Sequence, residues 1–227
     1  MNVKRLEPRR KRPSDERPRE RLEALGIGAL TDAELVALLV GSGTRGASAL
    51  DIAHAALDDA GGLAALVRPD TRRARGFGRA RHARLRAGFE IALRASREAL
   101  RRHSALTSPE AVRDYLRLAL ASRDIEVFIA LFLDSQHRLI AADELFFGTL
   151  AQTSVYPREV VRTALAHNAA AVIFAHNHPS GVAEPSRADE LLTQSLKAAL
   201  ALVDVRALDH FVVAGGQVVS FAERGLL

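Results

Sequence analysis

The sequence predicts an α/β domain preceded by a small all-α domain. Residues 21–100 carry apolar residues at helical spacing. From residue 126 the pattern changes to β-rich runs, and AAAVIFA (169–175) is a short, wholly apolar run of the kind found in buried strands. We therefore expect a flexible basic arm over residues 1–20, a helical domain over 21–100 and an α/β domain over 105–227.

Composition narrows the class of protein. The chain has 227 residues, of which 48% are hydrophobic and only 5% aromatic, so Leu, Val, Ile and Ala must fill the core. There is no cysteine, so any metal site must use His, Asp or Glu. No apolar run approaches the roughly 18 residues that span a membrane, and the N-terminus lacks the apolar segment of a secretory signal. We expect a cytoplasmic protein without a membrane partner.

The basic residues are unevenly distributed, although the net charge is only +5. Prolines and dense charge over residues 1–20 predict the flexible arm. Clustered cations favour a phosphate-rich partner, and solubility is the alternative explanation. The two clusters are Lys4, Arg5, Arg9, Arg10, Lys11 and Arg12, and Arg68, Arg72, Arg73, Arg75, Arg79, Arg81, Arg84 and Arg86.

Three helices are predicted in the first domain. DAELVALLVG is apolar at helical spacing, with Asp32 as the expected N-cap and Gly41 as the stop. SALDIAHAALDDAGG predicts a second helix that ends at Gly61-Gly62. A long helix is expected from about Ala80 to about His103.

The turn that precedes this long helix has the sequence GFG. Glycines allow a backbone to approach a phosphate, and a helix N-terminus offers free N–H groups. The stretch resembles the helix-hairpin-helix DNA-binding motif, although His82 stands where that motif has a small residue. The resemblance implies contacts to nucleic acid from Gly76, Gly78, Arg79 and Arg81, and an ordinary helical packing unit is the alternative. The motif positions matched are Gly76, Phe77, Gly78, Arg81 and Leu85.

The second domain begins after residues 101–112, which we interpret as a junction. Its strands and helices alternate, as in a compact α/β domain. The expected elements are a hairpin of 126–134 and 138–147, a helix from Pro157 to about His167, a buried strand at 169–175, a helix from Ser186 to about Leu202, and a final hairpin of VRALDHFVVA and QVVSFA.

The heptapeptide AHNHPSG (175–181) is the strongest candidate for a site. Residues i and i+2 of an extended chain point the same way, so His176 and His178 can converge. Asp189 lies three residues after Ser186, the expected N-cap of the next helix. Two imidazoles and a carboxylate form the protein part of an open catalytic zinc site, and other divalent ions also fit. The alternatives are histidines of structural role and a capping box between Ser186 and Asp189.

HNHPSGVAEPSRAD fits the pattern H-x-H-P-x(6)-S-x-x-D and resembles the JAMM motif of MPN+ metalloproteases, which include isopeptidases. Further stretches are similar to the bacterial RadC family: LTDAELVALLVGSGTRG, ALFLDSQHRL, ELFFGTL, PREVVRTAL, AAVIFAHNHPSG, ALVDVRALDHFVV and SFAERGLL. The resemblance implies an MPN/JAMM-like domain with a mixed sheet flanked by helices. It also implies one zinc ion per chain, held by His176, His178 and Asp189.

The same resemblance implies roles in catalysis. Glu126 would be the general base, with Glu144 as its rival, and Ser186 would stabilise the tetrahedral intermediate. The reaction would be hydrolysis of an amide or isopeptide bond in a protein or peptide by metal-activated water. We expect His210 to be structural or to support the site, and His54, His82, His103, His137 and His167 have no spacing that suggests ligation.

Two other functions stay open. The RadC family has traditionally been associated with DNA repair, so the chain is alternatively a DNA-binding accessory protein in repair or recombination. The N-terminal domain would then deliver the C-terminal one to DNA. A catalytically silent scaffold is the third hypothesis, although such proteins typically lack the metal ligands that this chain retains.

Overall fold

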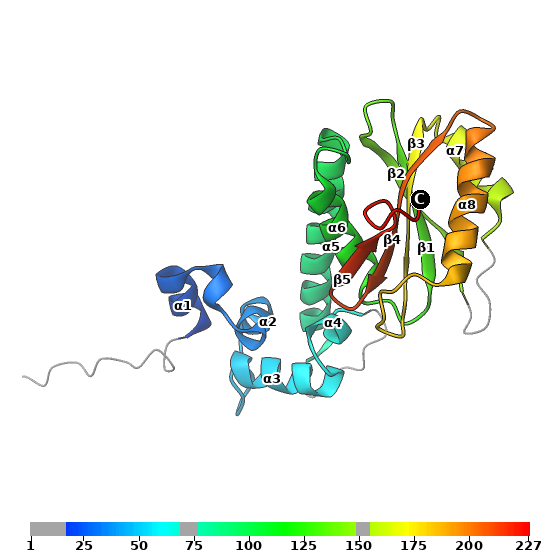
Figure 1. The fold of residues 1–227 in the computed structure, drawn as a ribbon. Coiled ribbons are helices and arrows are strands. Elements are labelled where there is room, and N and C mark those ends of the chain that lie inside the picture. The colour runs from blue at the N-terminus through cyan, green and yellow to red at the C-terminus, as the bar shows by residue number, and fades with distance from the viewer. Residues whose placement is uncertain (1–16, 69–76, 149–154) are drawn as a thin grey trace, which may run out of the picture. The chain divides into compact units, whose positions relative to one another are not determined.

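The structure is a computed structural model that describes residues 17–68, 77–148 and 155–227. Its contacts divide the chain into two compact units, Met1–Gly88 and Phe89–Leu227 (Figure 1). Residues 1–16 of the expected basic arm lie outside the described part. The end of that arm is helical, because helix α1 covers Pro18–Leu25. Proline is well suited to the first position of a helix, where its missing N–H costs no hydrogen bond.

The first unit is helical, as predicted. It consists of α1, the 3-10 helix η2 (Ile27–Ala29), α2 (Asp32–Val40), α3 (Ala49–Ala60), α4 (Leu63–Leu66) and the N-terminal part of α5 (Arg79–Arg102). The predicted N-cap of α2 was wrong by one residue. Thr31 is the cap, since its backbone is extended and its hydroxyl accepts a hydrogen bond from the Glu34 N–H, whereas Asp32 is already helical.

Apolar side chains from α2, α3, α4 and α5 form the core of this unit. Phe77, the middle residue of the GFG turn, is only 2% exposed and belongs to this core together with Leu85. The turn is therefore anchored by its aromatic ring, while Gly78 and Arg79 are exposed to solvent. Other members of the core are Val36, Val40, Ile52, Ala56 and Leu66.

The second unit contains a five-stranded mixed sheet, as predicted, in the order β2-β1-β3-β4-β5. Strands β3 and β4 are parallel, and the other neighbours are antiparallel. Both expected hairpins are present. The strands are β1 (Val127–Leu133), β2 (Leu139–Phe147), β3 (Ala171–Asn177), β4 (Arg206–Ala214) and β5 (Gln217–Ser220).

Helices cover both faces of this sheet (Figure 1). Helix α6 (Pro109–Leu120) and the C-terminal part of α5 pack on one face, and α7 (Pro157–Ala166) and α8 (Arg187–Ala201) pack on the other. The interpretation of residues 101–112 as a junction was wrong, because α6 begins within them. Leu100 is buried in the sheet core, so the contacts divide the chain inside α5, between Gly88 and Phe89, rather than near residue 100.

Strands β1 and β3 form the centre of the unit and are buried along their whole length. Their side chains alternate between the two cores: Ile129 and Ile173 face α6, whereas Phe128 and Phe174 face α7 and α8. Because β1 and β3 are antiparallel, with Phe128 opposite His176, the start of β1 lies beside the end of β3. This is the place where the candidate residues meet.

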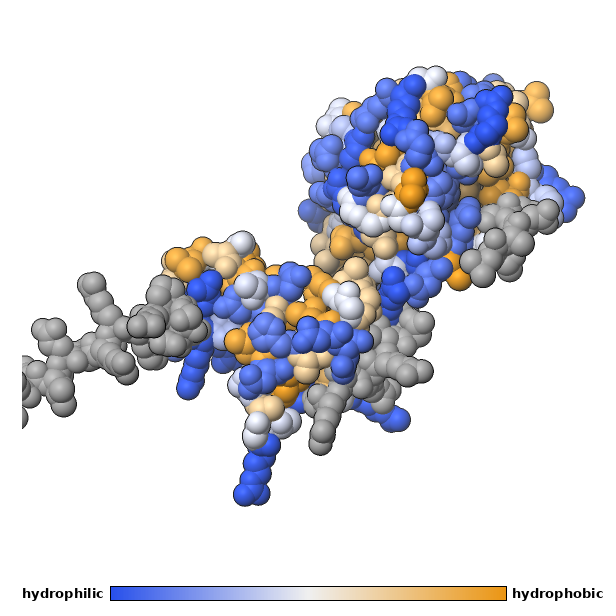
Figure 2. Space-filling model, turned by 60° about the horizontal axis from the view of Figure 1, so that its bottom comes forward, coloured by the Kyte–Doolittle hydropathy of each residue, from blue (hydrophilic) through white to orange (hydrophobic). Residues whose placement is uncertain are grey.

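The surface shows hydrophilic and apolar residues side by side on both units in the view of Figure 2. Among the described residues, no helix combines the length and the apolar character needed to cross a membrane.

Candidate metal centre

His176 is the penultimate residue of the buried strand β3. It is only 1% exposed, and its ring stacks on that of Phe128 with a centroid distance of 6.3 Å. His178 follows the strand, where its N–H donates to the Val213 carbonyl at 2.9 Å. Its Nδ1 lies 2.8 Å from the carbonyl oxygen of Val182. Since a carbonyl only accepts, Nδ1 carries the proton, and the lone pair of the neutral ring is on Nε2.

Asp189 comes from the first turn of α8, where it also forms a capping box with Ser186. The Asp189 N–H donates to the Ser186 hydroxyl at 3.2 Å, and the Ser186 N–H and hydroxyl donate to Asp189 Oδ2 at 2.7 and 2.6 Å. The capping box expected as the alternative to a metal site is thus present. It orients the carboxylate toward the histidines, so the two interpretations are compatible.

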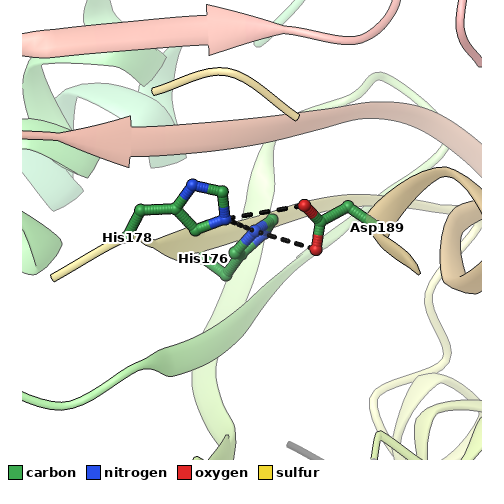
Figure 3. Close-up of side chains that lie close together, drawn as sticks. All are labelled: His176, His178 and Asp189. Atoms are coloured by element: carbon green, nitrogen blue, oxygen red, sulfur yellow. Dashed lines mark hydrogen bonds and ion pairs between the residues drawn. The ribbon is translucent and has the colours of Figure 1, made fainter. Parts of the chain in front are cut away.

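The three side chains point toward one another (Figure 3). His176 Nε2 lies 3.3 Å from Asp189 Oδ1, His178 Nε2 lies 3.5 Å from Asp189 Oδ2, and the two Nε2 atoms are 3.0 Å apart. Each residue offers one ligand atom, and these three atoms lie within 4.8 Å of one another. Among the described residues, this is the group of His, Asp and Glu side chains whose geometry suits a metal ion.

The electrostatics of the cluster favour a positive charge. Burial opposes ionisation of Asp189, but the rings of His176 and His178, when protonated, donate hydrogen bonds to it; these outweigh burial and hold the pKa of this carboxyl far below its usual range. The hydrogen bond with Asp189 raises the pKa of His178 against the effect of burial, and the charges of Asp189 and Glu126 add to the shift. The carboxylate is therefore ionised at neutral pH and attracts either protons or a cation.

Glu126 immediately precedes β1, and its charge acts on His178. As the residue two positions before Phe128, it falls by strand alternation on the face of the sheet that carries the cluster. The side chain of Asn177 fixes this backbone. Its Oδ1 accepts from the Val127 N–H at 2.8 Å, and its Nδ2 donates to the Ile125 carbonyl at 3.0 Å. Asn177, the residue between the two histidines, thus ties the Glu126 segment to the end of β3.

Glu144, the rival candidate, lies on the other face of the sheet. It is opposite Ile129, whose side chain belongs to the core under α6. Its carboxylate forms an ion pair with Arg123 and lines a small cavity together with Tyr115 and Leu93. The structure therefore brings Glu126, and not Glu144, to the face of the histidine cluster.

His210 is fully buried next to the cluster. Its Nε2 lies 2.9 Å from His176 Nδ1, and its Nδ1 lies 2.6 Å from the hydroxyl of Thr193. Burial lowers the pKa of His210 well below its ordinary value. Sequence reasoning missed Thr193 and Asn177. The position of Thr193 was predictable from the sequence, because a residue four positions after Asp189 lies on the same face of the helix.

The candidate residues for nucleic acid belong to the other unit. Gly76 lies outside the described residues, and Gly78 and Arg79 are exposed at the start of α5. Arg81 has a structural contact, since its guanidinium donates to the carbonyls of Ser42 at 2.7 Å and Gly43 at 3.2 Å. These carbonyls follow the C-terminus of α2, where a cation is favoured by the helix dipole.

Both units match known protein families. The family described as RadC-like JAB domain matches residues 106–226, and the family described as UPF0758 N-terminal matches residues 10–83. A UPF0758 protein of Methylibium petroleiphilum is 62% identical over 218 residues, which cover 95% of this chain and 98% of the relative. UPF0758 proteins of Leptothrix cholodnii and Dechloromonas aromatica are 59% and 58% identical, over 95% of this chain and 98% and 97% of those proteins.

Proposed function

Because the chain belongs to the RadC family, with a RadC-like JAB domain after a UPF0758 N-terminal region, we propose that it is a zinc-dependent hydrolase that cleaves an amide or isopeptide bond in a protein or peptide. The observation that carries the proposal is the convergence of His176, His178 and Asp189, whose ligand atoms lie within 4.8 Å of one another, beside the start of the central strand β1, which Glu126 immediately precedes. The resemblance of HNHPSGVAEPSRAD to the JAMM motif of metalloproteases supports it.

The donor set fits a divalent cation. Two imidazole nitrogens and a carboxylate oxygen are borderline ligands that suit zinc. His178 presents an Nε2 lone pair to His176 Nε2 at 3.0 Å, an arrangement that is repulsive unless a proton or a cation lies between the rings. When bound, zinc polarises a carbonyl oxygen and acidifies water.

The side chains around the cluster supply the rest of the chemistry. Glu126 would accept a proton from the attacking water and deliver it to the leaving nitrogen, a role that typically contributes ~10²–10⁴-fold to a rate. Ser186 would donate a hydrogen bond to the developing oxyanion. For this its hydroxyl must leave Asp189 Oδ2, to which it donates at 2.6 Å.

Two measurements on the purified protein test the proposal together. Elemental analysis is expected to find one zinc per chain. Incubation with a peptide library, with mass spectrometry of the products, is expected to find new termini that are absent when the metal is removed by a chelator. A protein without metal after purification and reloading would contradict the proposal.

Ser186 has two roles that one substitution can separate. Glycine is nearly as good an N-cap as serine, so we expect S186G to lower the free energy of unfolding by only a few tenths of a kcal/mol. Loss of the hydroxyl is expected to lower the cleavage rate by about 10²-fold. S48G is the matched control, because Ser48 forms the same box with Asp51 in α3. Equal cleavage rates for S186G and S48G would show that Ser186 acts only as a helix N-cap.

We further propose that the N-terminal unit associates with nucleic acid. The start of α5 is exposed and carries arginines without an acidic residue before Glu90. Arg79 and Arg86 are seven residues apart, so they share one face of the helix, and both are exposed. Contacts of this kind bind the phosphate backbone without reading the base sequence.

The double variant R79A/R86A is expected to weaken binding to a DNA duplex and to reduce the slope of log affinity against log salt by about 1 for each phosphate that an arginine no longer neutralises. R94A/R101A is the charge-matched control, since these arginines lie where α5 also carries Glu90 and Glu98. R81A is expected to differ from both by lowering the free energy of unfolding by about 1 kcal/mol, because it removes the hydrogen bonds to Ser42 and Gly43. Identical salt slopes for R79A/R86A and R94A/R101A would contradict the assignment.

A further inference from the structure

A chain of hydrogen bonds runs from α8 through β4 to the first histidine of the cluster. Thr193, His210 and His176 are all buried, with 0%, 0% and 1% of their surfaces exposed. The Thr193 hydroxyl lies 2.6 Å from the carbonyl oxygen of Asp189 and 2.6 Å from His210 Nδ1, and His210 Nε2 lies 2.9 Å from His176 Nδ1. Each contact in this chain holds one proton. The group at the end of the chain, the carbonyl of Asp189, therefore determines the donor and the acceptor in every contact.

The carbonyl oxygen of Asp189 fixes the first link. A carbonyl only accepts, so the single hydroxyl proton of Thr193 is donated to it. The hydroxyl oxygen is then the acceptor in its contact with His210, which means that His210 carries a proton on Nδ1. The neutral ring of His210 therefore has its lone pair on Nε2.

His176 follows from this arrangement. The Nε2 lone pair of His210 accepts a hydrogen bond, so His176 Nδ1 is the donor and carries the ring proton. The lone pair of His176 is then on Nε2, the atom that faces His178 and Asp189. This is the tautomer that is able to ligate a cation in the cluster.

Aromatic packing fixes the orientation of the His210 ring. Its ring stacks on Phe221 with a centroid distance of 4.7 Å and meets Phe128 edge-on at 5.5 Å. The carboxylate of Asp209 holds the turn that carries Phe221, since it accepts from the Ser220 hydroxyl at 2.6 Å and from the Ala222 N–H at 3.0 Å. Both ring nitrogens of His210 are consequently held at their partners.

We propose that Thr193 and His210 are positioning residues that hold His176 as the Nδ1–H tautomer, so that its Nε2 lone pair is reserved for the cation. This inference rests on the proposed function, because it assigns a purpose to the tautomer only if the cluster binds a cation. Outer hydrogen bonds to histidine ligands orient the ring and raise its basicity, and their loss typically costs about 10–100-fold in metal affinity.

Replacement of Thr193 by valine removes the hydroxyl and keeps the shape of the side chain. His210 Nδ1–H then loses its acceptor, and the proton is free to move to Nε2, where it opposes the Nδ1–H of His176. We expect T193V to bind zinc about 10–100-fold more weakly, as measured by competition with a chelating dye. T193S, which keeps the hydroxyl, is expected to bind as the wild type does.

T163V is the matched control. Thr163 in α7 donates its hydroxyl to the carbonyl of Glu159 at 2.8 Å, which is the same bond along a helix as that of Thr193 to Asp189, but among the described residues its hydroxyl makes no hydrogen bond to a histidine. The thermal stabilities of T193V and T163V in the absence of metal measure the cost of losing such a hydroxyl. A zinc affinity that falls equally in the two variants, or in neither, would overturn the inference.

The tautomers themselves are measurable without any metal. Long-range ¹H–¹⁵N correlation spectra of the metal-free protein at alkaline pH are expected to show the proton of His176 and of His210 on Nδ1, and a change at both rings in T193V. A neutral His176 in the wild type that carries its only proton on Nε2 overturns the inference even where zinc binds. A wild type that shows the expected tautomers but binds no zinc contradicts the proposed function, and the role given to this chain of hydrogen bonds falls with it.

Discussion

Replacement of Asp189 by asparagine is expected to remove zinc binding while leaving the fold intact. Asparagine has nearly the same shape and is still able to accept hydrogen bonds from Ser186, so the capping box is largely kept. The charge that draws a cation between the two imidazoles is lost. We expect the zinc affinity to fall by more than the roughly 10–100-fold that loss of an outer hydrogen-bonding partner costs.

The control for this variant is present in the same chain. Asp51 forms with Ser48 a box of nearly the same geometry, in which the Ser48 N–H and hydroxyl donate to Asp51 Oδ2 at 2.8 and 2.7 Å. D51N therefore changes the same kind of helix cap without changing the cluster. Zinc content after dialysis, and the rise in melting temperature on addition of zinc, are the measurements.

A ligand present at about 100 times its Kd stabilises a protein by about 2.7 kcal/mol, so the wild type and D51N are expected to show a clear thermal shift, and D189N none. The double variant H176Q/H178Q is expected to behave as D189N does. Full zinc occupancy in either of these variants would remove the basis for the proposed chemistry.

The part of the site that depends on local geometry was predictable from the sequence. An extended chain places residues i and i+2 on one side, which brings His176 and His178 together, and the Ser-x-x-Asp spacing predicts the box that orients Asp189. Helix α6 was also predictable. Its apolar residues Val112, Leu116 and Leu120 recur at helical spacing, and Pro109 is at its first turn, but the Ser-Pro start was interpreted as part of a junction.

The choice between Glu126 and Glu144 was not predictable, because it depends on a bulge. Phe128 is opposite Phe146, yet the next residue, Ile129, is opposite Glu144, so Leu145 is skipped. A single inserted residue reverses the faces of the side chains beyond it. Only the paired register shows that Glu144 faces α6 and Arg123, away from the histidines.

The links that hold the site rigid were equally hidden, because they join residues that are far apart in the sequence. Asn177 reaches the backbone of Val127, 50 positions away, and Thr193 reaches His210, 17 positions away. These contacts exist only after β3 has paired with both β1 and β4, and after α8 has packed on the sheet. The local sequence does not show which distant residues pair. The three ligands were predictable because they lie in one strand, the turn that follows it and the next helix.

The second large effect is expected at Glu126, where glutamine keeps the size and removes the base. We expect E126Q to bind zinc as the wild type does, since the three ligands are unchanged, and to cleave the peptides identified in the library about 10²–10⁴-fold more slowly. Initial rates at saturating zinc, together with the metal content of the same samples, separate the two properties.

E144Q is the matched control for this experiment. Glu144 is a glutamate from the same hairpin whose carboxylate is paired with Arg123 on the opposite face of the sheet, so its loss removes an exposed ion pair, which is typically worth less than about 1 kcal/mol, and leaves the cleavage rate near that of the wild type. If E144Q were inactive and E126Q active, the general base would lie on the face under α6, and the proposed hydrolysis would have to use a site other than the one formed at the end of β3.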